Sequence, residues 1–273
     1  MHRLIKRAGK SLIRLVSEST YESIRAYRAR QFSERYEIEQ GCDQLTRDCI
    51  EVHGGPTVQA GPFKGLKFPP IAHHRHLAPK LIGSYEHFLH TAIDRCIDRH
   101  ESSPYEQIIN VGSAEGYFTV GLARRLPNAE VVAFDTDPWA RKVTQEMATL
   151  NGCPNVRVEG ACSIGWLQEN LRAPALIVSD CEGFEFRLIN PDAVDFSRCD
   201  LVIEVHPDKR LPTSNFHINR FTTTHEVETY DWVAPHPEHW AGHLHQSKRE
   251  QAVCEYRTDQ ESQYWLVTFY KSD

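Results

Sequence analysis

Two stretches of this sequence carry residues suited to ligand binding and catalysis. In the first, IINVGSAEGYFTVGLA, an apolar run ends at Gly112, and Glu115 stands between that glycine and Gly116. A side chain at position 112 would block a ligand lying over the turn, and Gly116 lets a helix start close to the preceding strand. Asp135 ends the next apolar run, about 20 residues on, where a carboxylate can bind both hydroxyls of a ribose.

The spacing of this turn bears on the kind of cofactor. A dinucleotide turn has the pattern G-x-G-x-x-G, which lets backbone amides approach a pyrophosphate. Here Ser113 and Ala114 occupy the middle, and the Glu115 carboxylate stands near the place of the phosphate. That charge favours a ligand with a sulfonium and an amino group. We therefore expect S-adenosylmethionine, and the turn disfavours NAD.

The second group of residues is acidic and contains one histidine. SDCEGFE supplies Asp180, Glu182 and Glu185, and VIEVHP supplies Glu204 and His206. Both follow apolar runs, so on parallel strands they would converge on the edge that holds the turn. Methyl transfer to a hydroxyl benefits from a base, and His206 is the best single candidate by its ordinary pKa. Asp180 or Glu182 would orient it or act directly, whereas solvated acids at strand ends are the alternative.

A divalent cation is a different use of the second group. Asp180, Glu204 and His206 are the candidate ligands for Mg or Mn. Such an ion would lower the pKa of an acceptor hydroxyl.

Alternating strand and helix patterns predict a Rossmann-like, doubly wound, mainly parallel sheet of seven strands with an antiparallel last strand. Helices are expected over Tyr117–Leu126 and from Pro138, capped by Asp137, to Asn151. The strands are predicted at Gln107–Val111, Glu130–Asp135, Asn155–Val158, Ala175–Asp180, Leu201–His206, His225–Trp232 and Tyr264–Tyr270.

Three parts are expected along the chain. Residues 1–50 form a helical basic extension, residues 51–100 a hairpin and helical cap, and residues 101–273 the core, with an insertion at about 233–262. In the cap, Phe63, Leu66 and Phe68 anchor the hairpin, and a helix runs from Pro79 to His100.

The insertion shows no strong helix and is expected near the mouth of the site. Trp240 and several histidines would form an acceptor pocket there, with plain polar surface as the alternative. The histidines are His236, His239, His243 and His245. Their spacing fits no common zinc site, and His73–His76 is expected to be a solvated loop.

Several stretches together resemble the FkbM-type family of class I S-adenosylmethionine-dependent methyltransferases. They are KGLKF, GSYEHF, NVGSAEGYFTVGLA, VVAFDTDP, SDCEGFEFRLI and LVIEVHP, within residues 61–207. The resemblance implies O-methylation of a sugar, glycan or specialised metabolite. It implies a cofactor site formed by Glu86, Asn110, Gly112, Ser113, Glu115, Gly116, Asp135 and Asp180.

One position departs from the class I pattern, which usually has an acid where Asn110 stands. An amide can still hydrogen-bond the methionine amino group, and Glu115 would compensate for the missing charge. The alternatives are an N-methyltransferase acting on a peptide or amine, an oxidoreductase, and a cofactor-binding scaffold without turnover.

Composition sets the outer limits. Hydrophobic residues make up 40% of the chain and charged residues 25%, as in a globular protein. No apolar run reaches the ~18 residues of a membrane span, and the N-terminus does not resemble a secretory signal. Eight cysteines include no CxxC pair, which favours a reducing cytoplasm.

The net charge of −6 is unevenly distributed, since residues 1–35 hold nine Lys/Arg and three Asp/Glu. Residues 1–20 are therefore expected either to pack on the body or to make weak, peripheral membrane contact. The acidic body disfavours nucleic acid as a partner. Folds of this kind often pair, so a homodimer is one expectation.

Overall fold

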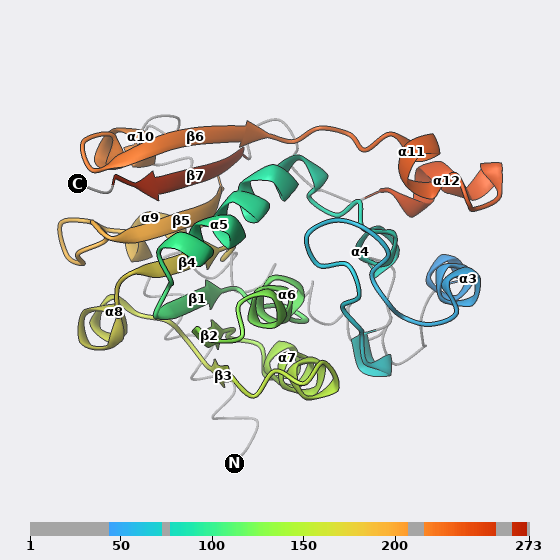
Figure 1. The fold of residues 1–273 in the computed structure, drawn as a ribbon, viewed down its shortest axis with the longest axis horizontal. Helices are drawn as coiled ribbons and strands as arrows, with labels where there is room; N and C mark the ends of the chain where they lie inside the picture. The colour runs from blue at the N-terminus through green and yellow to red at the C-terminus, as the bar shows by residue number, and fades with distance from the viewer. Residues whose placement is uncertain (1–43, 73–76, 207–215, 255–263, 272–273) are drawn as a thin grey trace, which may run out of the picture.

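The computed structural model describes residues 44–72, 77–206, 216–254 and 264–271. The basic N-terminal segment and His73–His76 therefore lie outside the described residues. The described part is built around one sheet with helices on both faces (Figure 1).

The sheet has seven strands in the order β3-β2-β1-β4-β5-β7-β6. Only β7 runs antiparallel to its neighbours, which confirms the predicted fold class. The strands are β1 (Gln107–Val111), β2 (Glu130–Phe134), β3 (Val156–Glu159), β4 (Ala175–Ser179), β5 (Cys199–Val205), β6 (His225–Asp231) and β7 (Tyr264–Tyr270).

The central strands are apolar on both faces because helices cover both. Along β1, Ile108 belongs to one buried cluster and Ile109 to the other, as the two-residue period of a strand requires. The first cluster lies under α5 (His90–Ser102), α6 (Tyr117–Arg125) and α7 (Pro138–Leu150). The second lies under α8 (Ile164–Asn170), α9 (Glu185–Leu188) and α10 (Phe216–Phe221).

The predicted start of α7 is confirmed in detail. The side chain of Asp137 accepts a hydrogen bond from the backbone N–H of Trp139, and Pro138 occupies the first helical position.

A cap of short helices lies beyond the sheet, formed by α3 (Gln44–His53), η1 (Pro70–Ala72), α4 (Leu77–Ile82) and η2 (His87–Leu89). The predicted hairpin is present as a bridge between Thr57 and Lys67, and its three apolar anchors are buried. The continuous helix predicted from Pro79 to His100 is wrong. α4 ends at Ile82 because Gly83 turns with φ +89° against the backbone carbonyl of Ala60, which a Cβ would approach to 2.4 Å.

The insertion before β7, where no strong helix was expected, contains two short helices, α11 (Pro237–Ala241) and α12 (Gln246–Ala252). Both pack near the cap rather than on the sheet (Figure 1). Lys248 forms an ion pair with Asp48, and the rings of His243 and His53 lie 4.7 Å apart.

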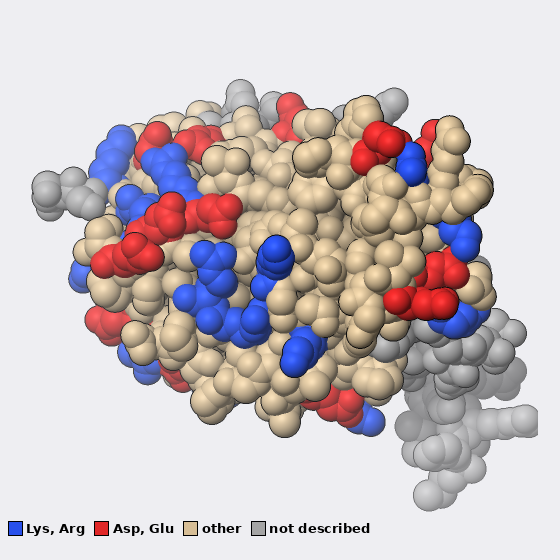
Figure 2. Space-filling model, turned by 45° about the vertical axis from the view of Figure 1, so that its right-hand side comes forward, with Lys and Arg blue, Asp and Glu red and all other residues tan. Residues whose placement is uncertain are grey.

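Charged groups of both signs lie next to one another on the surface. In Figure 2, Lys and Arg side chains are drawn beside rows of Asp and Glu side chains. Arg95, for example, bonds to Glu226 and Glu228 on β6. In the described part of the chain, no helix is both long and apolar enough to cross a membrane.

His90 predicts a pH dependence of stability. Burial lowers the pKa of His90 from 6.5 to about 4, so the folded state favours the neutral ring. This stabilisation is complete above pH 6.5 and is lost as the pH falls towards 4, by about 2–3 kcal/mol at pH 4.5. The gap in unfolding free energy between wild type and His90→Gln should therefore shrink between pH 7 and pH 4.5 in urea titrations. Other titrating groups cancel in this difference, and a gap independent of pH would contradict the assignment.

Candidate functional site

The turn after β1 is pressed against the loop after β4. Gly112 has φ +81°, and a Cβ on it would lie 1.7 Å from the backbone oxygen of Asp180. The glycine is thus required by a neighbouring chain segment, which is a different reason from the ligand clearance that the sequence suggested. Gly116, with φ +96°, brings the start of α6 close to Thr144 on α7.

The backbone amides of this turn are largely used within the protein. Gly112 and Ser113 both donate to the carbonyl of Phe134, Gly116 donates to the carbonyl of Ser113, and the Ala114 amide donates to Asp135. Four of the five amides from Gly112 to Gly116 are therefore occupied. A pyrophosphate would need several of these amides free.

Asp135 lies at the end of β2 and is half-buried. Its Oδ2 accepts from the Ala114 amide at 3.0 Å, and its Oδ1 accepts from the Asp137 amide at 2.8 Å. Burial raises the pKa of this carboxyl, and the two amide bonds oppose that shift. Each oxygen makes one hydrogen bond here and can accept a further hydroxyl.

Two predicted cofactor residues hold the turn to its neighbours. The amide of Asn110 is buried, accepts from the Thr119 hydroxyl at 2.6 Å and donates to the Val178 carbonyl at 3.3 Å. The Ser113 hydroxyl is also buried and lies 3.3 Å from that of Thr144.

Glu115 projects into a buried ion pair with Lys80 of α4. The Lys80 ammonium also lies 4.5 Å from the centre of the Tyr85 ring. The charge of Glu115 is thus balanced by the protein itself, which weakens its use as a sign of a cationic ligand. Lys80 escaped the sequence analysis because it stands 35 residues before its partner, and spacing carries no signal of such a pair.

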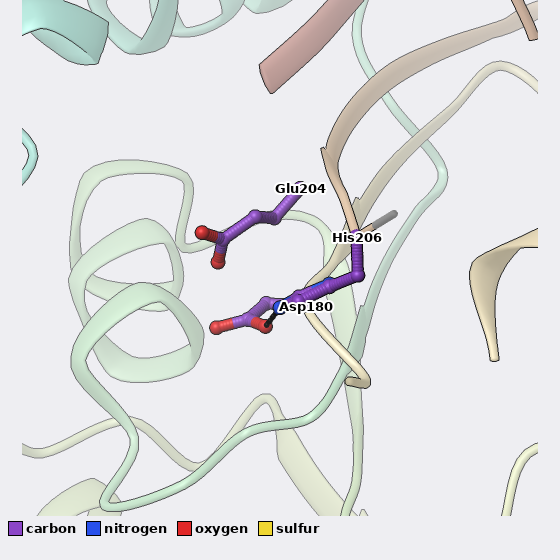
Figure 3. A group of neighbouring side chains, drawn as sticks. All are labelled: Asp180, Glu204 and His206. Carbon is purple, nitrogen blue, oxygen red and sulfur yellow. Dashed lines mark ion pairs between the residues drawn. The ribbon is translucent and has the colours of Figure 1, made fainter. Parts of the chain in front are cut away.

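The second acidic group does come together at the same edge. Asp180, Glu204 and His206 offer ligand atoms that all lie within 4.8 Å of one another, and Figure 3 shows His206 extending toward Asp180. His206 Nε2 lies 3.8 Å from Asp180 Oδ1 and 3.9 Å from Glu182 Oε2. Asp180, Glu204 and His206 could hold a divalent cation. Glu182 is largely exposed.

Asp180, Glu204 and His206 are called here the acidic cluster. Their charges shift one another's pKa values. Burial and the neighbouring Glu204 carboxylate raise the pKa of Asp180 well above its usual value. Burial alone would lower the pKa of His206, but the hydrogen bond to Glu185 and the nearby carboxylates raise it to about 9. His206 therefore carries a proton at neutral pH, contrary to the ordinary pKa on which its choice as base depended.

The GSYEHF segment lies beside both groups. Glu86 is buried and adopts a left-handed backbone conformation with φ 50°. Burial, followed by the charges of Glu86, Asp180 and Glu204, raises the pKa of Tyr85 well above 10. Tyr85 was not singled out from the sequence, although it stands next to Glu86 in a motif that was.

The rings of the insertion contact the protein's own cap. Trp240 lies 5.9 Å from His87, 5.8 Å from His90 and 5.1 Å from His239, between ring centres. His245 caps α12 by accepting from the Ser247 amide, and His236 precedes α11. The acceptor pocket proposed for these residues stays a prediction.

Comparisons with known proteins give distant likeness in fold. No protein-family model matches the sequence, including any for the FkbM type, and no curated protein matches it. A precorrin-6y C5,15-methyltransferase from Geobacter metallireducens is 16% identical over 67% of this chain and 89% of that one, with a TM-score of 0.45. A putative O-methyltransferase from Klebsiella pneumoniae is 13% identical over 88% and 96%, with a TM-score of 0.42. The O-methyltransferase TomG from Streptomyces achromogenes is 12% identical over 84% and 91%, with a TM-score of 0.42. Likeness at this level carries no argument about function.

The contact at Gly112 predicts a large loss of stability on substitution. Gly112→Ala combines a left-handed backbone with a clash against the Asp180 carbonyl, and it should cost about 4 kcal/mol or more. Gly152→Ala is the matched control, because Gly152 has φ +66° and nothing within 4 Å of its Cβ position. It should cost only about 1–2 kcal/mol. Equal costs in urea unfolding would show that the close approach does not constrain the fold.

The Lys80–Glu115 pair predicts strong energetic coupling. Lys80→Met leaves a buried carboxylate without its ion-pair partner and should cost about 3–5 kcal/mol, with partial recovery in the Lys80→Met/Glu115→Met double variant. The exposed pair Lys142–Glu146, at 3.7 Å, serves as the control and should couple by about 0.5 kcal/mol or less. Urea unfolding of both double-mutant cycles measures this, and similar coupling in the two cycles would contradict the prediction.

Proposed function

We propose that this protein is an S-adenosylmethionine-dependent methyltransferase that methylates a hydroxyl of a sugar, glycan or specialised metabolite. One observation carries the proposal. The Asp135 carboxylate, which suits two ribose hydroxyls, lies on one side of the glycine turn after β1, and the acidic cluster lies on the other side. The resemblance of the motifs to the FkbM type supports the hydroxyl acceptor.

The residues of the turn fit this cofactor better than a dinucleotide. Asp135 keeps lone pairs on both oxygens for two ribose hydroxyls. The occupied amides of Gly112, Ser113 and Gly116 suit a ligand without phosphate. This argument replaces the one from the charge of Glu115, because that charge is balanced by Lys80.

We also assign roles at the cofactor site to the other residues predicted to form it. Asn110, Gly112, Ser113 and Gly116 hold the shape of the turn, and Glu86 and Asp180 flank it. When bound, S-adenosylmethionine supplies a methyl group activated by its positively charged sulfur.

On the acceptor side, we assign the base to Asp180. Burial and the Glu204 carboxylate raise its pKa, so its ionised form is a stronger base than an ordinary carboxylate and takes a proton from a hydroxyl more readily. His206 and Glu204 lie next to it, with Glu182 at the exposed rim. We assign the protonated His206 ring the role of stabilising the negative charge on Asp180, and Glu204 the role of raising the pKa of Asp180. Mg or Mn bound by Asp180, Glu204 and His206 would instead lower the pKa of the hydroxyl directly.

Calorimetric titration with S-adenosylhomocysteine tests the cofactor site. Wild type should bind with micromolar affinity. Asp135→Ala should bind about 10- to 100-fold more weakly, because two hydrogen bonds to a charged group are lost. Asp98→Ala, an exposed acid on α5, is the control and should bind like wild type.

The same titration with and without EDTA separates the uses of the acidic cluster. Once an acceptor is found among hydroxylated compounds, Asp180→Asn and His206→Ala should both abolish turnover, and His206→Ala should leave cofactor affinity intact. Undiminished turnover would overturn the acceptor-side assignment. If S-adenosylhomocysteine binds in neither condition, Asn110 marks a lost or altered cofactor site, and a non-enzymatic role is favoured.

A further inference from the structure

A buried carboxylate lies behind His206 and has no part in the function proposed above. Glu185 begins α9, and its side chain is fully buried. Its Oε1 lies 3.2 Å from His206 Nδ1 and accepts the backbone N–H of Cys181 at 2.7 Å. Burial raises the pKa of Glu185, but the bond to His206 outweighs this, so the carboxyl is ionised and its pKa is lowered.

The contact determines which nitrogen of His206 faces the site. Nδ1 faces a carboxylate oxygen that can only accept, so Nδ1 must carry a proton. Nε2 then faces Asp180 Oδ1 and Glu182 Oε2, at 3.8 and 3.9 Å, which are contacts too long for hydrogen bonds. The ring therefore presents one defined atom, Nε2, to the space beside Asp180.

We infer that Glu185 is a positioning residue that binds Nδ1–H of His206 and turns Nε2 toward Asp180, and that it holds the ring in the Nδ1–H form when the ring is neutral. The inference rests on the proposed function only in naming this space as the acceptor side. Buried carboxylates behind a histidine commonly fix its tautomer and ring orientation in catalytic and metal sites.

The alternative to a positioning role is a purely structural role for Glu185. The same Oε1 also accepts the Cys181 amide, and that bond alone would hold the loop after β4. The two roles differ in what happens to the ring. Loss of a loop anchor changes stability, whereas loss of the positioning bond changes the protonation form of His206.

The test is long-range ¹H–¹⁵N NMR of the imidazole rings in the full chain, at about pH 10, where His206 has lost its extra proton. His206→Gln identifies the signal. Wild type should show the Nδ1–H form, and in Glu185→Met, which has no acceptor oxygen, most of the population should change to Nε2–H. Glu182→Met is the matched control, because it makes the same change near the other nitrogen and should leave the Nδ1–H form in place.

An Nε2–H ring in wild type, or an unchanged Nδ1–H ring in Glu185→Met, would overturn the inference. The wild-type result needs no change at Glu185, and Glu185→Gln, which keeps an acceptor oxygen, should retain the Nδ1–H form.

Cofactor titration on the same samples keeps this result separate from the proposed function. S-adenosylhomocysteine should bind Glu185→Met within about threefold of wild type, since the contacts of Glu185 are with the Cys181 amide and His206. If wild type binds no cofactor, the methyltransferase proposal fails while the ring form still decides the role of Glu185. With an acceptor in hand, Glu185→Met should lower kcat about 100-fold with little change in KM.

Discussion

The close approach of Gly112 to the backbone oxygen of Asp180 is the constraint on which the site depends. β1 and β4 are paired neighbours, and the Asp180 amide continues that pairing by donating to Val111. Because no side chain separates the two loops, the glycine turn and the acidic cluster form one unit. A residue with a Cβ at position 112 would push the cluster away from the turn, and two half-sites would result.

Two sets of charged side chains lie at this edge of the sheet. On the turn, Lys80 neutralises Glu115 inside the protein, and the pair ties the cap to the core. Across the turn, His206 lies within 4 Å of carboxylate oxygens of Asp180, Glu182 and Glu185. These neighbouring carboxylates favour the protonated form of the imidazole, which is why the pKa of His206 is raised although the ring is mostly buried.

The sequence was sufficient for the sheet and for part of the site. Short apolar runs such as Ile108–Val111 and Leu201–Val205 predict strands covered on both faces, and parallel order then brings their ends together. The sequence was insufficient for features that depend on a residue far away along the chain. Gly83 interrupts a helical pattern because of Ala60, Glu115 faces Lys80, and the pKa of His206 is set by carboxylates on another strand's loop. Periodicity reports which face is buried, and it carries no information about the partner.

Strained backbone conformations occur in the loops at this edge of the sheet. Among the described residues, the non-glycine positions with positive φ are Glu86, Ala114 and Glu182. They lie in the loops before α5, after β1 and after β4, all of which meet at the site. Glycine would adopt these conformations about 1 kcal/mol more easily. At Glu182 the strained residue carries a carboxylate that lies 3.9 Å from His206 Nε2, so a charge is held beside the acidic cluster at a cost in stability. At Ala114 the strained residue instead directs its amide to Asp135, so the carboxylate after β2 is held by the turn after β1.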